Sequence, residues 1–281
     1  MPENRVRSRL GKAGLAAAAA LAVILAGWLF LRLANPQWHW RLYAHQAAGS
    51  PEGRLDPPPG YDGTWNNWTG EGLLISAYAY RNGRRDGPYQ TFDRNGSPLS
   101  RGGYTNGELE GAQLINQEDG SRTEVIYRNG KRHGLERTWF ASGQLAVEAP
   151  WVDGVQEGPV VFYYQDGSPQ ASIPFYNGKI EGAQKTWHEN GVLQGEETYR
   201  ESLKNGSSRF WRPDGVLEMS LNYREDRMDG TQTWYHANGT KAKEINLLQG
   251  APHGAWREWD ENGILTIDEE YDRGELKKKE E

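Results

Sequence analysis

The sequence predicts an all-β fold: an elongated repeat sheet of stacked β-hairpins, about nine units of 24 residues, that follows an N-terminal transmembrane helix. Three observations predict the repeats. A glycine recurs every 24 residues with a single step of 23, a second glycine follows each one nine residues later, and an aromatic residue holds a fixed position between them. A period of this length is typical of an architecture in which one supersecondary unit is copied and stacked.

Each unit carries structural glycines in two columns. The first column holds Gly63, Gly87, Gly111, Gly134, Gly158, Gly182, Gly206, Gly230 and Gly254. The second column holds Gly72, Gly96, Gly120, Gly143, Gly167, Gly191, Gly215, Gly239 and Gly263, and Asn or Asp precedes most of its members. Both central residues of a two-residue hairpin turn need positive φ, which Asn-Gly and Asp-Gly tolerate best. The second column therefore predicts a two-residue hairpin turn in each unit.

The opposite end of each unit reads aromatic-x-x-Gly, as in Tyr127 and Gly130. Three units depart from this pattern, because Ser202 and Asp226 replace the glycine and Leu247 replaces the aromatic residue. We expect altered turns in those three units.

An aromatic residue stands five positions after the first-column glycine in every unit but one, where Asn116 replaces it. The structural aromatics of this column are Trp68, Phe92, Trp139, Tyr163, Trp187, Trp211, Tyr235 and Trp259. One ring per unit predicts a ladder of rings on one face of the sheet, which would form a continuous core. Hydrophobic residues make up only 36% of the chain, so we expect a thin sheet rather than a thick globular core.

Residues 1–60 differ from the repeats and predict a membrane anchor. Residues 1–13 form a basic flank, and Gly14 to Leu31 is an uncharged run of 18 residues, close to the minimum that spans a bilayer as a helix. We expect a transmembrane signal anchor over residues 14–33. The alternative is a cleaved signal peptide, which has a shorter apolar region and a small-x-small site directly after it. Residues 34–60 predict a Pro-rich spacer, residues 61–276 the repeat domain, and residues 277–281 a charged tail.

The charge distribution predicts the compartment. A basic N-terminal flank stays in the cytoplasm, so we expect a single-pass protein of the bacterial inner membrane whose repeats lie in the periplasm or elsewhere outside the cytoplasm. Signal cleavage would instead give a secreted protein. The whole chain carries −6 and residues 1–50 carry +5, so residues 51–281 carry −11. This acidic balance argues against nucleic acid as a partner.

The repeats contain no recognisable catalytic motif and no cysteine. We predict no enzymatic activity, no cofactor and no metal site; His133 and His253 share a column but stand five units apart. The residue before the first-column glycine is acidic in most units and predicts a stripe that contacts a basic partner. The candidate partner-binding residues are Asp86, Glu110, Glu157, Glu181 and Asp229. Two such carboxylates about 9.6 Å apart fit an inverting glycosidase, but an acid at a repeated turn is more often a solvated turn residue.

The pattern Tyr-x-Asn-Gly-Lys-x-x-Gly, followed by a Trp-Phe pair and a further glycine, runs from Tyr127 to Gly143. It resembles the variant MORN repeat of bacterial YwqK-type antitoxin-like proteins, and the resemblance covers about residues 61–274. It implies hairpins laid side by side, no cofactor, and a role in contacting a protein partner. The antitoxin relatives imply a toxin as that partner, and the anchor places such a toxin outside the cytoplasm.

From these patterns we expect a membrane-anchored, non-enzymatic protein-interaction module of the antitoxin or immunity type. The alternative is a structural cell-envelope protein that self-associates or binds polysaccharide. Because a linear sheet leaves unpaired strands at its ends, the terminal units are candidates for self-association.

Overall fold

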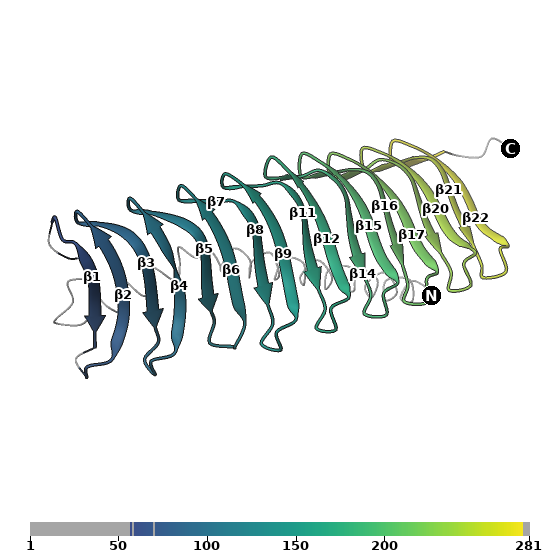
Figure 1. The fold of residues 1–281 in the computed structure, drawn as a ribbon. Coiled ribbons are helices and arrows are strands. Elements are labelled where there is room, and N and C mark those ends of the chain that lie inside the picture. Colours follow the sequence, from purple (N-terminus) through teal and green to yellow (C-terminus); the bar gives the residue numbers. More distant parts are fainter. Residues whose placement is uncertain (1–56, 58, 70, 278–281) are drawn as a thin grey trace. The chain divides into compact units, whose positions relative to one another are not determined.

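The computed structural model describes residues 57, 59–69 and 71–277 (Figure 1). The predicted basic flank, the transmembrane segment 14–33, nearly all of the spacer and residues 278–281 lie outside the described residues. Among those that are described, no helix is long and apolar enough to cross a membrane. Of the described residues, 67–69 and 71–74 belong to one compact unit, and residues 59–66 and 75–277 belong to the other.

The described part of the smaller unit is a turn. It spans the end of strand β1 (Gly63–Trp68) and the first residue of β2 (Leu74–Arg81), and the Thr69 N–H donates to the Leu73 carbonyl at 2.8 Å. Trp68 is 53% exposed.

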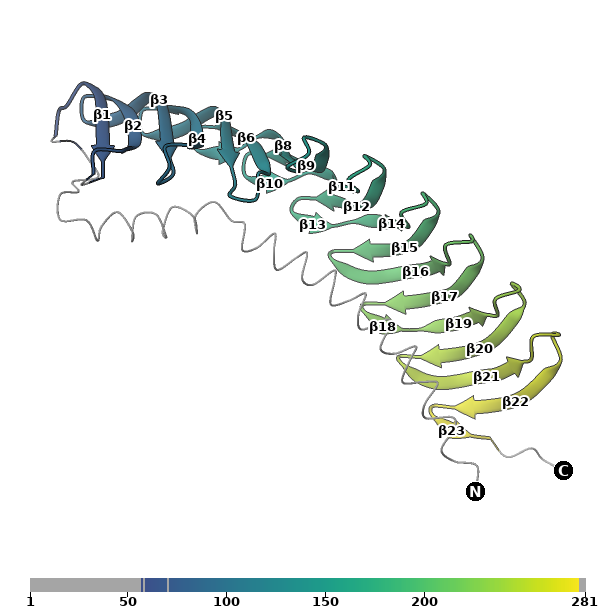
Figure 2. The same ribbon diagram turned by 90° about the horizontal axis from the view of Figure 1, so that it is seen from below.

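The larger unit is an antiparallel sheet in which consecutive strands pair in chain order, and Figure 2 shows their alternating directions. After β2, the strands that lead into the two-residue turns are β4 (Pro98–Thr105), β6 (Arg122–Arg128), β9 (Leu145–Val152), β12 (Pro169–Tyr176), β15 (Leu193–Arg200), β17 (Leu217–Arg224), β20 (Lys241–Leu248) and β22 (Leu265–Asp272). The strands that follow these turns unbroken are β3 (Arg84–Phe92), β5 (Glu108–Asn116), β16 (Leu203–Trp211) and β21 (Ala251–Trp259).

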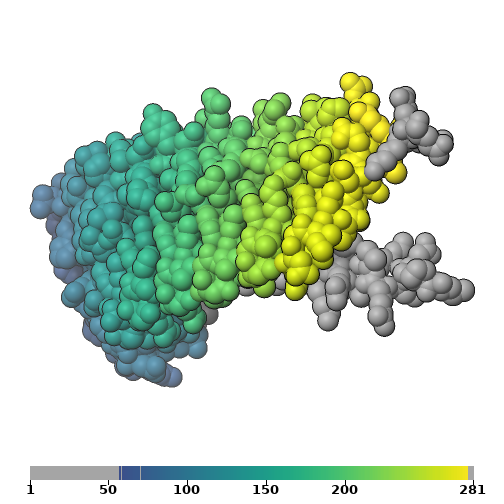
Figure 3. Space-filling view, turned by 90° about the vertical axis from the view of Figure 1, so that its right-hand side faces the viewer, coloured from purple at the N-terminus to yellow at the C-terminus, as the bar shows by residue number. Residues whose placement is uncertain are grey.

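In four units the strand after the turn is split just before the first-column glycine. The pieces are β7 (Lys131–Arg132) and β8 (Gly134–Trp139), β10 (Val155–Gln156) and β11 (Gly158–Tyr163), β13 (Lys179–Ile180) and β14 (Gly182–Trp187), and β18 (Arg227–Met228) and β19 (Gly230–Tyr235). The two-residue β23 (Glu275–Leu276) ends the sheet. In Figure 3 the successive hairpins appear as adjacent bands in chain order. The predicted all-β sheet of stacked hairpins is confirmed.

The two-residue turns lie at the aromatic-x-x-Gly end of each unit. Tyr176 pairs with Lys179 across Asn177 and Gly178, whose φ angles are 50° and 75°. Positive φ at both central residues defines a type I′ turn, whose twist matches that of the flanking strands. Asn accepts this region more readily than most residues, and glycine has no Cβ to obstruct it.

The second-column glycine closes a longer turn, so the two-residue turn predicted there is wrong. The Gly167 N–H donates to the Tyr164 carbonyl at 3.0 Å, and the Tyr164 N–H donates to the Ser168 carbonyl at 2.9 Å. Gly167 has a φ of 87°, whereas Asp166 has no positive φ. Asp166 Oδ1 instead accepts from the Ser168 hydroxyl and backbone N–H, which lowers the pKa of its carboxyl. Asp suits the position before this glycine because its carboxylate accepts hydrogen bonds from the residue that follows the glycine.

The altered turns predicted for three units are also wrong. Ser202 and Asp226 keep the positive φ of the glycine they replace, at 66° and 64°, and Leu248 pairs with Ala251 across the usual two residues. The replacing side chains gain a bond that glycine lacks. Ser202 Oγ accepts the Ile180 N–H at 2.9 Å, and Asp226 Oδ1 accepts the Lys204 N–H at 2.7 Å.

A β-bulge near the longer turn explains the repeat period. Phe162 pairs with Ala171 but Tyr163 pairs with Pro169, so Gln170 is an extra residue. The single unit of 23 residues lacks this bulge, because Ile115 pairs with Thr123 and Asn116 pairs with Arg122 without a register shift. The residue missing from that unit is therefore the bulge residue.

The buried side chains alternate along the strands and lie on one face, called the inner face below. The most buried row of this face contains the second residue after each first-column glycine and its partner on the adjacent strand. Examples are Gln113 with Val125 and Gln232 with Ile245. The predicted aromatic column is not this core: Trp139, Trp187 and its other described members are partly exposed. The column stands where the bulge and the longer turn end the strand, which leaves these side chains partly exposed.

Candidate functional site

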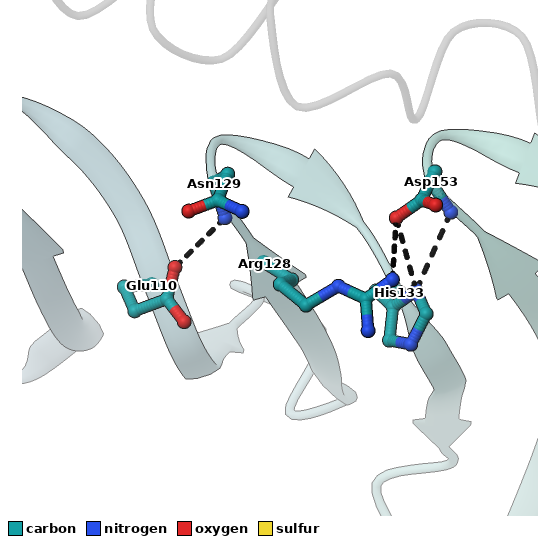
Figure 4. A network of polar contacts seen from close by, with 5 residues as sticks. All are labelled: Glu110, Arg128, Asn129, His133 and Asp153. Carbon is teal, nitrogen blue, oxygen red and sulfur yellow. Dashed lines mark hydrogen bonds and ion pairs between the residues drawn. The ribbon is translucent and has the colours of Figure 1, made fainter.

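The candidate carboxylates lie along the edge formed by the two-residue turns, called the turn edge below. Each accepts a hydrogen bond from the backbone N–H of the first turn residue in the next unit. Glu110 Oε2 accepts from Asn129 at 2.8 Å (Figure 4). The same bond joins Glu157 to Asn177 and Glu181 to Glu201 at 2.8 Å, Asp229 to Gln249 at 3.1 Å, and Asp86 to Asn106 at 3.5 Å.

A local backbone bulge brings each carboxylate to the next turn. The Glu157 N–H donates to the Pro150 carbonyl at 3.2 Å, and Gly158 follows with a φ of 105°. A Cβ on Gly158 would also lie 3.2 Å from Pro150 Cγ. The first-column glycine is needed here for both its φ and its small volume.

A main-chain bond runs beside each carboxylate bond. The Gly178 N–H donates to the Gln156 carbonyl at 3.0 Å, and the second residue of every two-residue turn from Gly83 to Gly274 makes the equivalent bond to the preceding unit. In most units the preceding unit therefore satisfies both N–H groups of the turn, one with a side chain and one with its backbone.

His133 occupies the carboxylate position in one unit. The Asp153 N–H lies 3.4 Å from His133 Nδ1, and the Asp153 carboxylate lies 2.8 Å from Arg128 and 3.3 Å from His133 (Figure 4). The hydrogen bond from Arg128 lowers the pKa of the exposed Asp153 carboxyl. This unit thus combines a histidine acceptor with a charged turn residue.

The five candidate carboxylates form one row, and each of them caps a turn. Capping engages one oxygen of each group. Asp86 and Asp229 place the other oxygen 3.8 Å from Arg81 and 3.2 Å from Arg224. Contact between this row and a basic partner stays a prediction.

The opposite edge carries a second set of bonds between units. The Tyr164 hydroxyl donates to the Trp187 carbonyl at 2.7 Å, and Nε2 of His188 lies 2.8 Å from the Trp211 carbonyl. His236 makes the same contact with Trp259 at 2.8 Å. The aromatic column therefore supplies main-chain acceptors to the preceding unit, which fixes neighbouring hairpins at both ends.

Sequence reasoning missed the buried glutamines of the inner face. Gln113 Nε2 donates to the carbonyls of Gly103, Glu110 and Gly111 at 3.2, 3.0 and 3.3 Å. Gln232 bonds in the same way to the carbonyls of the preceding strand and of its own first-column glycine. These bonds give the glutamine amide main-chain acceptors beside the bulge, as a buried polar group requires. The available signal was the recurrence of Gln two residues after Gly111, Gly182 and Gly230.

A cluster of tyrosines around Arg85 fills the inner face of the first units. The Arg85 guanidinium lies 4.4 Å from the Tyr78 ring centroid and 5.5 Å from that of Tyr104, and it donates to the Tyr80 hydroxyl at 3.3 Å. Tyr78 stacks on Tyr89 with ring centroids 5.3 Å apart. Burial raises the pKa of the Tyr78 hydroxyl well above its usual range. These rings form a local core.

The face of the sheet opposite the inner face is called the outer face below. The kind of side chain on it varies most from unit to unit at the positions beside the two-residue turns. Directly paired residues of antiparallel strands share a face, so the residues before and after each turn lie together on it. Those before the turn, all exposed, are Arg81, Thr105, Arg128, Val152, Tyr176, Arg200, Arg224, Leu248 and Asp272. Those after it, all exposed except Ala251, are Arg84, Glu108, Lys131, Val155, Lys179, Leu203, Arg227, Ala251 and Glu275.

The spacing of the charged side chains in the described residues does not form a metal site. Within the described ranges, no three His, Asp or Glu side chains lie close enough together to hold a metal ion. The adjacent pairs with the predicted glycosidase-like spacing are Asp86 with Glu110 and Glu157 with Glu181. Each of these carboxylates is bonded to a turn of the next unit. The arrangement serves to hold hairpins in register.

Fold and bonding pattern define a β-hairpin repeat protein in which each unit caps its neighbour. The family described as the MORN repeat variant matches residues 132–153, 180–201, 228–248 and 252–280. In these four segments the chain is thus similar to the MORN repeat variant, and such repeats suggest a protein-interaction or binding module. No curated protein matches the chain.

Proposed function

We propose that the repeat sheet is a non-enzymatic module that binds a partner protein. The observation that carries this proposal is that some positions of the repeat keep the same kind of residue from unit to unit, whereas others vary. The positions that hold hairpins together are nearly uniform, whereas the exposed positions beside the two-residue turns change in charge and size from unit to unit. A repeat scaffold with variable, outward-facing side chains presents an extended surface on which a partner is recognised at several points.

The resemblance to YwqK-type proteins supports an antitoxin-like or immunity-like role, in which binding neutralises a toxic protein. The apolar segment 14–33 supports attachment to the bacterial inner membrane with the repeats outside the cytoplasm. In this proposal the carboxylate row contacts basic groups of the partner. Glu110, Glu157 and Glu181 offer their second oxygens, whereas those of Asp86 and Asp229 face Arg81 and Arg224.

The second candidate is a structural envelope protein that binds polysaccharide. Two exposed rings favour it, since Trp68 is 53% exposed and Tyr176 is 61% exposed. Binding of the full-length protein to isolated cell-wall glycans, lost in a Trp68→Ala, Tyr176→Ala variant, would support this candidate over the first.

The deciding experiment is chemical crosslinking of the tagged full-length protein in its own cells, followed by purification and mass spectrometry. We expect one dominant protein partner, encoded near this gene if the role is of the antitoxin type. A Glu157→Gln, Glu181→Gln variant keeps the turn acceptors and removes two charges, so weaker capture by this variant would assign contact to the row. Recovery of glycan or of no specific protein would contradict the proposal.

A further inference from the structure

Exposed apolar side chains gather on the outer face in the middle of the sheet. Val152 and Val155 lie opposite each other beside one turn, and Tyr176 lies before the next turn. They are 47%, 42% and 61% exposed. The exposed Pro159 adjoins them on the same face. These four residues are called the central patch below.

The central patch is continuous across two hairpins. A Cβ built on Gly178 would lie 3.4 Å from Val155 Cγ1, so the valine packs against the turn that follows Tyr176. Pro150 and Pro174, half-buried on the same face, border the neighbouring first-column glycines, with Pro150 Cγ 3.2 Å from a Cβ on Gly158. The prolines and valines lie on stiff backbone, so a ligand meets a pre-formed apolar surface.

Positive charge surrounds the central patch. Between Gly63 and Asp229, the outer-face cations are Arg81, Arg84, Arg101, Arg128, Lys131, Arg137, Lys179, Lys185, Arg200, Arg209, Arg224 and Arg227. The outer-face carboxylates over the same range are Glu108, Glu124, Glu148 and Glu196. Over this range the face is therefore net positive, although residues 51–281 carry −11.

Some of these cations are already neutralised. Arg128 and Lys179 pair with the turn acids Asp153 and Glu201, and Arg137 pairs with Glu148 at 2.8 Å. Lys131 and Arg200, which flank the patch on its two sides, are exposed on the same face. Lys131 and Arg200 can therefore pair with carboxylates of a ligand that covers the apolar side chains.

We propose that the central patch and its flanking cations dock a segment of the partner protein whose apolar side chains are flanked by carboxylates. This proposal rests on the partner-binding function above and names the chemistry of the partner. Apolar side chains of the segment cover Val152, Val155 and Tyr176, while its carboxylates face Lys131 and Arg200.

Other occupants fit the charges less well. A second copy that docked through the same face would bring one net-positive face against another, and residues 1–50 of this chain are themselves at +5. An anionic membrane surface would meet the turn acids Asp153, Glu201, Glu225 and Asp226, which project along the adjoining edge. A protein segment can place its carboxylates between those acids, because its charges are discrete.

The test places a photoreactive phenylalanine analogue at Val155, at Tyr176 or at Leu248 of the full-length protein in its own cells. Leu248 is the matched control, because it is an exposed apolar residue at the same strand position three hairpins from Tyr176. We expect the Val155 and Tyr176 probes to label an acidic, apolar segment of a protein, with about a tenth of that yield at Leu248. A Lys131→Glu, Arg200→Glu variant is expected to lower the Val155 yield about tenfold.

The outcomes separate the docking proposal from the proposed function. Labelling of lipid, of residues 1–56, of a second copy or of a basic segment overturns the docking proposal, as does an unchanged yield after the charge reversal. If chemical crosslinking captures a partner but the Val155 and Tyr176 probes do not, only the docking site is wrong. If neither method captures a protein, both proposals fail. Equal thermal unfolding midpoints of all variants show that the exposed substitutions leave the fold intact.

Discussion

Glu157 accepts the Asn177 N–H with one oxygen, so glutamine in its place keeps the acceptor while alanine removes it. We expect Glu157→Ala to lower the free energy of unfolding by about 1 kcal/mol, the usual magnitude for loss of a capping acceptor. Glu157→Gln is expected to cost less than half as much. Urea unfolding of the two variants measures the difference. Equal losses would mean that charge, not the acceptor, stabilises the turn.

Gly102 and Gln113 form a coupled pair on the inner face. A Cβ on Gly102 would lie 1.7 Å from Gln113 Oε1, so Gly102→Ala forces the buried amide away from its three carbonyl acceptors. We expect Gly102→Ala to destabilise the fold by about 2 kcal/mol. Most of that loss should disappear when Gln113 is already alanine. A double-mutant cycle by urea unfolding tests the coupling, and strictly additive losses would refute it.

The half-buried Glu136 gives a pH-dependent contribution to the free energy of unfolding. Burial raises the pKa of its carboxyl, although Arg132 lies 3.0 Å away and opposes the shift. A group whose pKa is higher in the folded state binds protons more readily there, so its contribution to stability is lost as pH rises through the folded value. Glutamine mimics the neutral acid at every pH.

We therefore expect Glu136→Gln to gain stability relative to the unmodified protein as pH rises from about 4 to about 7. Below about pH 4 the difference between the two proteins should level off, because Glu136 is protonated in both states. Urea unfolding at several pH values measures it. A difference that shifts toward the unmodified protein with rising pH would show that Arg132 outweighs the effect of burial.

At the scale of elements, the two-residue turns differ in how much strain they hold. Glu225 has a φ of 50°, a region that asparagine tolerates better than glutamate. We expect Glu225→Asn to raise the free energy of unfolding by about 0.5 kcal/mol. Thermal or urea unfolding measures this, with Arg273→Asn as a matched change at φ 47° in the last two-residue turn. A loss of stability in both variants would contradict this explanation.

The hairpins could be predicted from the sequence because glycine spacing survives in every unit, but the turn types could not. Both turns can hold Asn or Asp before Gly: Asn177 takes positive φ itself, whereas Asp166 serves as a side-chain acceptor. The dipeptide alone does not distinguish these uses. The bulge at Gln170 likewise carries no composition signal, so neither the open position of the aromatic column nor the buried glutamine row could be derived.

The candidate carboxylates could be predicted because they recur at the position before the first-column glycine. Since equivalent positions of stacked units lie side by side, their arrangement in a row along one edge could be predicted as well. Their bond to the next turn was hidden because it joins residues of different units, such as Glu181 and Glu201. Spacing within one unit describes the hairpin but not what its neighbour supplies. The charge of the outer face was hidden for a related reason, since the net charge of a chain does not reveal how two faces divide it.

At the scale of the whole molecule, the last full strand bears on self-association. β22 carries Asp268, Glu269, Glu270 and Asp272. Within the described residues, the edge of β22 that faces away from β21 pairs only near the end of the strand, where it meets β23. Charges on an edge strand oppose pairing with another edge. We therefore expect any association through the terminal units to be weak at low salt and to strengthen when salt screens these carboxylates.

Light scattering of the full-length protein at fixed detergent, over a concentration series at low and high salt, measures this association. An Asp268→Asn, Glu270→Gln variant should associate at low salt as the unmodified protein does at high salt. A mass that changes with neither salt nor concentration would rule out the terminal units as an interface.

The bonds that pass between units also determine how such a chain can evolve in length. At each edge, an internal unit donates hydrogen bonds to one neighbouring unit and accepts them from the other. In-frame duplication or loss of one unit therefore leaves its neighbours with equivalent hydrogen-bond partners. The 23-residue unit shows a second permitted change: it has lost its bulge residue, yet Asn129 and Gly130 still bond to the preceding unit. Recombination between repeats can therefore change the reach of the binding surface in whole-unit steps without new compensating mutations.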